Sequence, residues 1–245
     1  MGARFGSLLR EELRFLSFRS PGADFAERRR ALLALGLCAT WLAGIGRYWD
    51  NPRASLFQHL GLGSVAYAFV LAAILWVVVR PLRPRHWSYG NVLLFVCLTA
   101  PPAVLYAIPV ERFLSLELAA TINVWFLGVV AAWRVALLCT FLRRTAGLGW
   151  IEVTTAALLP MTAIVTVLAV LNLEHVVFDL MAGLSEEQRG PNDGAYLFVL
   201  WLTEASLYAG PVLFLVYLGC VARRARAPAT AVPRDPDAPS RHGDS

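Results

Sequence analysis

Long apolar runs without a single charge constrain this chain more than any other feature. Residues 60–79 are the clearest case, with twenty residues and no Asp, Glu, Lys or Arg. At 1.5 Å per residue, such a helix is about 30 Å long, which matches the hydrocarbon thickness of a bilayer. Apolar residues make up 58% of the chain and charged residues 16%, against roughly 45–50% and about 25% in soluble domains. These features predict an all-α, polytopic bundle of transmembrane helices.

Six runs of this kind are predicted to cross the membrane. The first is short for a span, about 24 Å, and we expect Tyr48 and Trp49 to extend it into the interface. The runs divide the chain into an N-terminal tail, residues 1–30, a six-helix domain, residues 31–222, and a C-terminal tail, residues 223–245. The predicted spans are residues 31–46, 60–79, 91–110, 118–142, 151–173 and 195–221.

The two tails have different patterns. In the N-terminal tail, Phe5, Leu8, Leu9, Leu13 and Leu16 recur at helical spacing with charged residues between them. This pattern predicts a short amphipathic helix that lies on the membrane surface. The C-terminal tail is rich in Pro, Ala, Arg and Asp and has no apolar period, so we expect it to be disordered.

The arginines predict the orientation. All 22 basic residues are Arg; 17 lie in the two tails and in the loops 80–90 and 143–150, whereas the other loops hold four. An excess of Arg marks cytoplasmic loops, so both termini are expected to be cytoplasmic. The absence of Lys beside abundant Ala, Arg, Gly and Pro indicates a bacterial origin, and therefore the bacterial inner membrane. The opposite loops, residues 47–59, 111–117 and 174–194, carry eight acids.

The remaining basic residue, Arg134, lies inside a predicted span. A charge near the middle of a membrane costs roughly 2.5–3.5 kcal/mol on insertion scales, so such residues usually face the bundle interior. Asn123 lies eleven residues earlier, on the same helix face, and Glu204 is the obvious partner of opposite charge. We expect a structural Arg134–Glu204 pair; the alternative is a substrate or ion contact made by these three residues.

A second polar group is predicted on the outer face, where Glu174, His175 and Asp179 lie close in sequence. His175 and Asp179 are four residues apart and share a helix face, so with His59 they are weak candidates for a metal site. The alternative is a solvated acidic helix. No cofactor is expected, because the four Cys form no CxxC pair. The outer-face cluster as a whole is Glu111, Arg112, Glu174, His175 and Asp179.

Prolines interrupt three of the predicted spans. They are Pro101-Pro102, Pro160 and Pro211. Each removes a backbone hydrogen bond that lipid cannot replace, so neighbouring side chains must cover the freed carbonyls. We interpret these breaks as packing features, although interrupted helices also occur at transporter binding sites.

The functional prediction is a non-catalytic membrane scaffold or interaction protein, because no GxSG, CxxC, phosphate-loop or GxGxxG motif is present. Its Arg-rich tails are expected to contact anionic lipid headgroups, with a protein partner or a second copy of the chain as further candidates and nucleic acid excluded. One alternative is a small-solute permease, or the membrane subunit of a transporter, using Arg134 and Glu204; the layout loosely resembles the permease subunits of ABC-type exporters. The other alternative is an outward-facing enzyme or metal site at His175 and Asp179.

Overall fold

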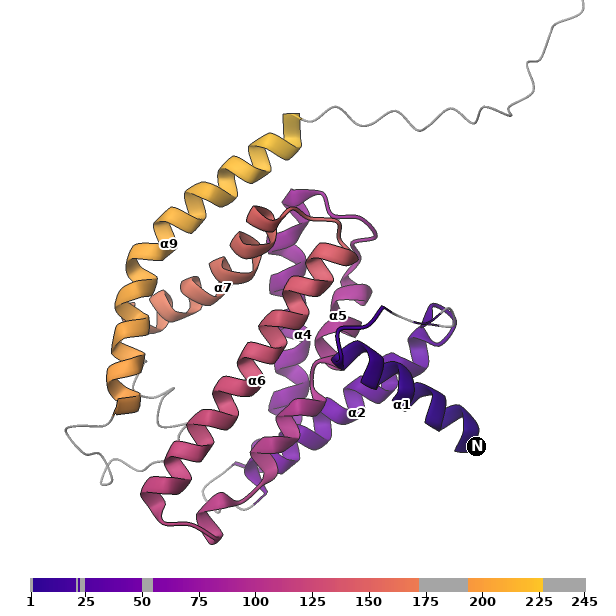
Figure 1. Ribbon diagram of the computed structural model, residues 1–245, viewed down its shortest axis with the longest axis vertical. Helices are drawn as coiled ribbons and strands as arrows, with labels where there is room; N and C mark the ends of the chain where they lie inside the picture. Colours follow the sequence, from indigo (N-terminus) through magenta and orange to yellow (C-terminus); the bar gives the residue numbers. More distant parts are fainter. Residues whose placement is uncertain (1, 21, 23–24, 50–54, 172–193, 227–245) are drawn as a thin grey trace, which may run out of the picture.

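The computed structural model describes residues 2–20, 22, 25–49, 55–171 and 194–226, and every regular element in these ranges is a helix (Figure 1). The prediction of an all-α chain is therefore confirmed for the described residues. In chain order, the elements are α1 (Gly2–Leu16), α2 (Arg29–Tyr48), α3 (Leu56–His59), α4 (Leu62–Val79), η2 (Arg80–Leu82), α5 (Tyr89–Leu98), η3 (Pro101–Ala107), η4 (Val110–Arg112), α6 (Leu116–Arg144), α7 (Trp150–Val170) and α9 (Gly194–Arg226).

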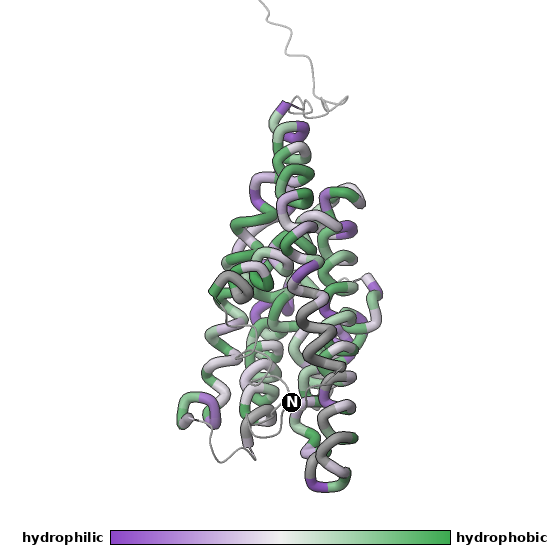
Figure 2. Tube along the Cα trace, turned by 90° about the vertical axis from the view of Figure 1, so that its left-hand side faces the viewer, coloured by the Kyte–Doolittle hydropathy of each residue, from purple (hydrophilic) through white to green (hydrophobic). Residues whose placement is uncertain are grey.

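Four of these helices are long and apolar enough to cross a membrane. The segments are Leu62–Leu82, which is α4 with η2, Thr121–Arg144 of α6, Trp150–Val167 of α7 and Thr203–Arg226 of α9. Figure 2 shows long apolar stretches along the helices. The bent pair of α5 and η3 becomes a fifth if it is counted as one span. The structure thus supports a multi-pass membrane chain with four to five such helices, fewer than the six predicted.

The difference from six lies in α2, which covers the predicted span 31–46. This helix has 20 residues, but within the described residues it is not among the four that are long and apolar enough. Arg29 and Arg30 stand at its start and Arg47 near its end. The apolar stretch between them is correspondingly short.

The interruption predicted at Pro101-Pro102 is confirmed. α5 ends at Leu98, η3 begins at Pro101, and the two are bent by 43°. A proline has no N–H to donate and its ring clashes with the preceding turn, which ends the regular helix here. In contrast, Pro160 and Pro211 lie inside α7 and α9, which continue through them.

The chain packs as two neighbouring groups of helices. α2, α4 and α5 contact one another, and α6 joins them through a shared core in which the rings of Phe95 and Phe141 stack with centroids 4.4 Å apart. α7 and α9 form the most extensive helix pair and lie side by side at the left of Figure 1. A second core joins α7 and α9 to α4 and α6 through Val79, Leu142 and Cys220.

Two glycines allow close approaches in the first group. Gly36 of α2 crosses α5 where an added Cβ would lie 2.9 Å from the Cβ of Cys97. Gly61 separates α3 from α4 with a φ of +66°, a conformation that favours glycine. A side chain at Gly61 would also meet the Trp41 carbonyl oxygen at 2.6 Å. Larger residues at either position would push α2 away from its neighbours.

α1 divides its apolar side chains between two surfaces. Leu8 and Phe15 pack against the core that contains Leu32, Leu94 and Leu98. A second row, Phe5, Leu9 and Leu13, is exposed. The second row is the surface that a membrane-surface helix would present to lipid.

The C-terminal boundary differs from the prediction. A disordered tail was expected from residue 223, but α9 continues to Arg226, so that expectation is wrong for residues 223–226. The physical reason is a pair of ionic contacts with α7, described below. Residues 227–245 lie outside the described part of the chain.

Candidate functional site

Arg134 of α6 contacts the break between α5 and η3. Its Nε donates a hydrogen bond to the Thr99 carbonyl oxygen at 3.0 Å. Thr99 follows the last residue of α5. In a continuing α-helix its carbonyl would accept from the Ala103 N–H, but that N–H donates to the Ala100 carbonyl oxygen at 2.9 Å instead. The Thr99 hydroxyl donates to the Val96 carbonyl oxygen at 2.7 Å. The Thr99 carbonyl is therefore satisfied by a side chain from α6, as membrane interiors require.

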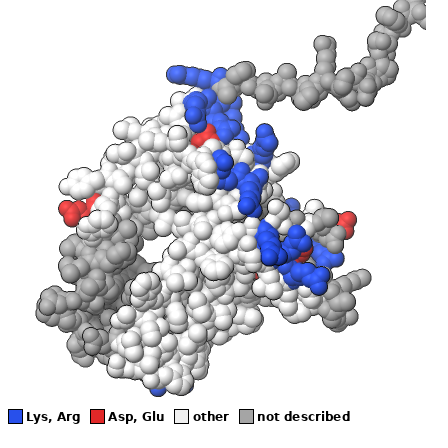
Figure 3. All heavy atoms as spheres, in the orientation of Figure 1, with Lys and Arg blue, Asp and Glu red and all other residues white. Residues whose placement is uncertain are grey.

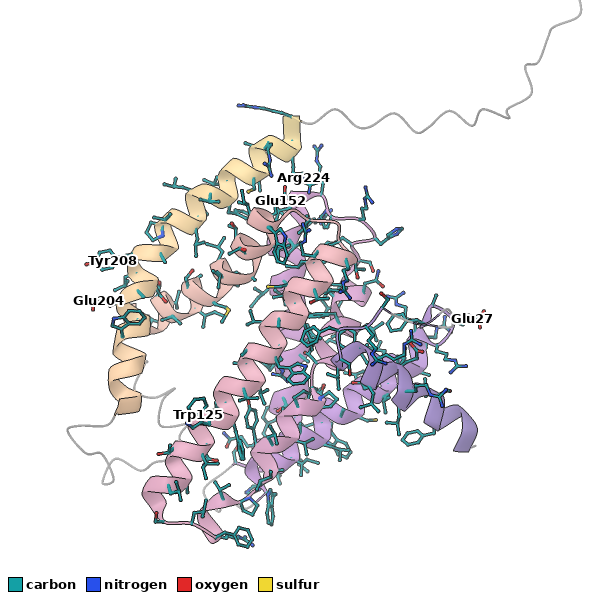
Figure 4. The ribbon with its side chains drawn as sticks, viewed as in Figure 1. Glu27, Trp125, Glu152, Glu204, Tyr208 and Arg224 are labelled. Atoms are coloured by element: carbon teal, nitrogen blue, oxygen red, sulfur yellow. The ribbon has the colours of Figure 1, made fainter. Side chains whose placement is uncertain are left out.

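The structure does not bring Glu204 to Arg134. Glu204 is exposed on α9, and its side chain points away from the other helices (Figure 4). The expected Arg134–Glu204 pair is therefore not formed. The reason is that α9 packs on α7 and leaves its Glu204 side outward. Asn123 lies on α6 and is half-buried.

The predicted outer-face cluster is only partly described. Arg112 is exposed, and its Cζ lies 4.9 Å from the centroid of the Trp49 ring. Glu111 belongs to η4 and His59 ends α3. Glu174, His175 and Asp179 lie outside the described residues. Within the described ranges, no three metal-binding side chains gather in a group.

A buried carboxylate that the sequence analysis did not single out joins α7 to α9. Glu152 is 1% exposed and lies in the first turn of α7. It accepts from the Gly149 N–H at 2.8 Å and from Arg223 Nη2 at 3.1 Å. Arg224 donates Nε to one of its oxygens at 2.8 Å and Nη2 to the other at 2.5 Å, the two-pronged geometry that suits guanidinium and carboxylate. Figure 4 shows the Glu152 and Arg224 side chains close together between the ends of the two helices.

The Glu152 contacts belong to a larger arginine-rich face, made by the described residues of four segments: 17–20 with 25–30, 80–86, 143–150 and 223–226. Hydrogen bonds connect these segments. Arg144 Nη1 donates to the Phe18 carbonyl oxygen at 2.6 Å, and Arg83 Nη1 donates to the Arg224 carbonyl oxygen at 3.3 Å. The Arg85 N–H donates to the Ala146 carbonyl oxygen at 3.0 Å.

The basic side chains of this face are largely accessible. In Figure 3 they form a band along one edge of the molecule, from the C-terminal end of α9 to the region of α1 and α2. The exposed members are Arg19, Arg29, Arg30, Arg80, Arg83, Arg85, Arg143, Arg144, Arg223 and Arg226. Four segments predicted to share one membrane side thus meet at one face of the molecule.

An all-helical chain with four or five long apolar helices and a basic face at one end has the architecture of a multi-pass membrane protein. No family model, no curated protein and no solved structure matches this chain.

Proposed function

We propose that this protein is a non-catalytic membrane scaffold whose arginine-rich face lies at the cytoplasmic surface of a bacterial inner membrane and binds anionic phospholipid headgroups. The observation that carries the proposal is the convergence of four Arg-bearing segments on one face, joined by the Arg144–Phe18 and Arg83–Arg224 hydrogen bonds. Arginine excess on one side of the membrane is the usual mark of the cytoplasmic side.

The proposal includes six membrane crossings. Both termini lie on the same side only if the number of crossings is even. The four long helices and the bent pair of α5 and η3 give five. α2 supplies the sixth: its 20 residues are about 30 Å long, and it packs against α4, α5 and η3.

Lipid binding follows from the chemistry of the face. Each basic residue near an anionic leaflet contributes about 1 kcal/mol of attraction. Guanidinium groups also donate two parallel hydrogen bonds to phosphate, which ammonium groups do not. Both anionic and zwitterionic phospholipids carry a phosphate, so the preference for anionic lipids comes from their net negative charge.

The test compares two spin-labelled lipids around the full-length protein in phosphatidylcholine vesicles. Spin-labelled phosphatidylglycerol should be immobilised at least about fivefold more strongly than spin-labelled phosphatidylcholine, the factor that corresponds to one engaged arginine. The preference should weaken as salt is raised, because salt screens exposed charges. Equal association of the two lipids at low salt would contradict the proposal.

The two other hypotheses have less support from the contacts of their residues. The permease hypothesis assigns Arg134 and Glu204 to one solute path, but these residues face different surroundings: Arg134 contacts the Thr99 carbonyl and Glu204 is exposed on α9. The enzyme or metal hypothesis depends on His175 and Asp179, which the structure does not describe.

A further inference from the structure

A groove lies where α6 ends and α7 begins. Its volume is about 490 Å³, within the range of roughly 300–1,000 Å³ that small-molecule sites occupy. All but one of its lining residues come from one face of α6, since they recur every three or four positions. The lining residues are Ala136, Cys139, Thr140, Arg143, Arg144 and Trp150.

Two guanidinium groups stand at the end of this groove that belongs to the arginine-rich face. Arg143 donates Nη1 to the Leu148 carbonyl oxygen at 3.1 Å, and Arg144 donates Nη1 to the Phe18 carbonyl oxygen. Each guanidinium has five N–H groups, and no further hydrogen bond uses them within the described part of the chain. These contacts hold the two cations in place and leave most of their donors for an anion.

Trp150 forms the other side of the groove. It is exposed, and the Arg143 Cζ lies 4.5 Å from the centroid of its ring. Tryptophan at a membrane interface places an apolar ring at headgroup level. The groove therefore combines two cations with the aromatic residue typical of that depth.

A furrow of small residues continues from the groove along α6. Gly128, Ala132 and Ala136 follow one another at four-residue spacing, and Thr140 is the next position. A Cβ added at Gly128 would meet nothing within 4 Å, and Ala132 and Ala136 are exposed. From residue 128 to residue 140 the furrow is about 18 Å long, a little more than half of the roughly 30 Å hydrocarbon core.

Large side chains border this furrow. Trp125, Val129 and Trp133 form the neighbouring four-residue row and are all exposed. A row of large residues beside a row of small ones makes a ridge next to a groove on the helix surface. The furrow thus has the length of one leaflet and a raised apolar wall.

We propose that this groove binds one anionic phospholipid, with its phosphate on Arg143 and Arg144 and one acyl chain in the furrow from Thr140 to Gly128. The proposal rests on the lipid-binding function proposed above and names the site at which it occurs. Charge complementarity selects the headgroup, and the length and apolar wall of the furrow accommodate the chain.

The experiment titrates the full-length protein in zwitterionic detergent with dioleoyl-phosphatidylglycerol and measures the bound fraction by native mass spectrometry. The R143Q/R144Q variant should bind at least about tenfold more weakly, since two attractive charges are lost. The matched control is R30Q/R226Q, which removes two exposed charges from the same face but none from the groove. This control should change the affinity by less than about threefold.

A second variant, Ala136→Trp, fills the furrow without changing any charge. Because Ala136 is exposed, the substitution is compatible with the fold, which an unchanged thermal unfolding temperature would verify. It should weaken phosphatidylglycerol binding severalfold. Sodium phosphate should displace the lipid no better than sodium chloride of the same ionic strength, because a free phosphate lacks the acyl chain.

The outcomes separate the site from the general function. Equal weakening by R143Q/R144Q and R30Q/R226Q, with the overall phosphatidylglycerol preference kept, would overturn the site and leave the lipid-binding function intact. Full affinity in Ala136→Trp, or specific displacement by phosphate, would also overturn the site as described. If the unaltered protein shows no preference for phosphatidylglycerol over phosphatidylcholine, the proposed function itself is overturned.

Discussion

Arg224 of α9 makes a bidentate contact with the buried Glu152 of α7. Its Nε donates to one carboxylate oxygen at 2.8 Å and its Nη2 donates to the other at 2.5 Å. Arg223 reaches the same carboxylate with a single bond of 3.1 Å and is 65% exposed, against 32% for Arg224. The two neighbouring arginines therefore form a matched pair for an experiment.

Arg224→Gln should destabilise the α7–α9 pair far more than Arg223→Gln. Removing one partner of a buried ion pair costs about 3–5 kcal/mol, because the other charge stays buried; an exposed pair is worth about 0–1 kcal/mol. Since Arg224 is partly exposed, we expect about 2–3 kcal/mol for its loss and less than about 1 kcal/mol for Arg223. Reversible unfolding in mixed micelles measures both values. Equal losses would show that the two-pronged contact is not the main one.

Arg134→Ala should loosen the break between α5 and η3 while leaving the rest of the bundle in place. The Thr99 carbonyl would lose a charged donor in a buried setting, a change that costs about 1–3 kcal/mol. Hydrogen exchange should therefore accelerate in residues 99–107 and stay unchanged in α7. Arg144→Ala, at the exposed end of the same helix, is the control. Uniform acceleration over the whole chain would argue against a local role.

Glu12 should make the docking of α1 dependent on pH. Its carboxylate is 5% exposed, and both oxygens lack a hydrogen-bond partner within the part of the chain that the structure describes. Burial raises the pKa of Glu12 from 4.5 to about 7; the Cys97 thiol lies close enough to interact with it electrostatically. The docked state therefore holds the proton more tightly than the undocked state does.

The direction of the pH dependence of α1 docking follows from that difference in pKa. Docking is at full strength below about pH 4.5, weakens as pH rises to about 7 and then stays constant, with a total loss of about 3 kcal/mol. Hydrogen exchange of residues 2–16, corrected for its intrinsic pH dependence, should report this change. Glu12→Gln should remove it, whereas Glu27→Gln, at an exposed position that points outward in Figure 4, should not. A pH dependence that survives in Glu12→Gln would disprove the assignment.

The long helices could be predicted from the sequence because an uninterrupted apolar run needs no knowledge of its neighbours. The predicted spans 60–79 and 118–142 lie within two residues of the ends of α4 and α6. The break at Pro101 was also visible, since proline disrupts a helix through local sterics. Element type and approximate position are thus local properties of this chain.

The polar contacts could not be predicted in the same way because their partners are distant in sequence. Glu152 and Arg224 are 72 residues apart. The sequence did contain one signal of this contact, since a lone acid stands at the start of one apolar run and arginines stand at the end of another. Arg134 was expected to pair with Glu204; it donates instead to the Thr99 backbone carbonyl, a contact that a survey of side chains does not reveal. Glu12 was placed among the charged residues of α1, and only the packing of that helix shows that it is buried.

Cysteine accessibility tests the central claim, that the four Arg-bearing segments lie on the cytoplasmic side of the membrane, most directly. Single cysteines would replace His86, Thr145 or Arg226 on the arginine-rich face, and Ser55 or Ser115 at the other end of the helices. A membrane-impermeant maleimide is added to right-side-out or inside-out vesicles, with the unaltered protein as the control for its four native cysteines. We predict that positions 86, 145 and 226 react only in inside-out vesicles and that positions 55 and 115 react only in right-side-out vesicles. Reaction of positions 86, 145 and 226 from different sides of the membrane would contradict the account.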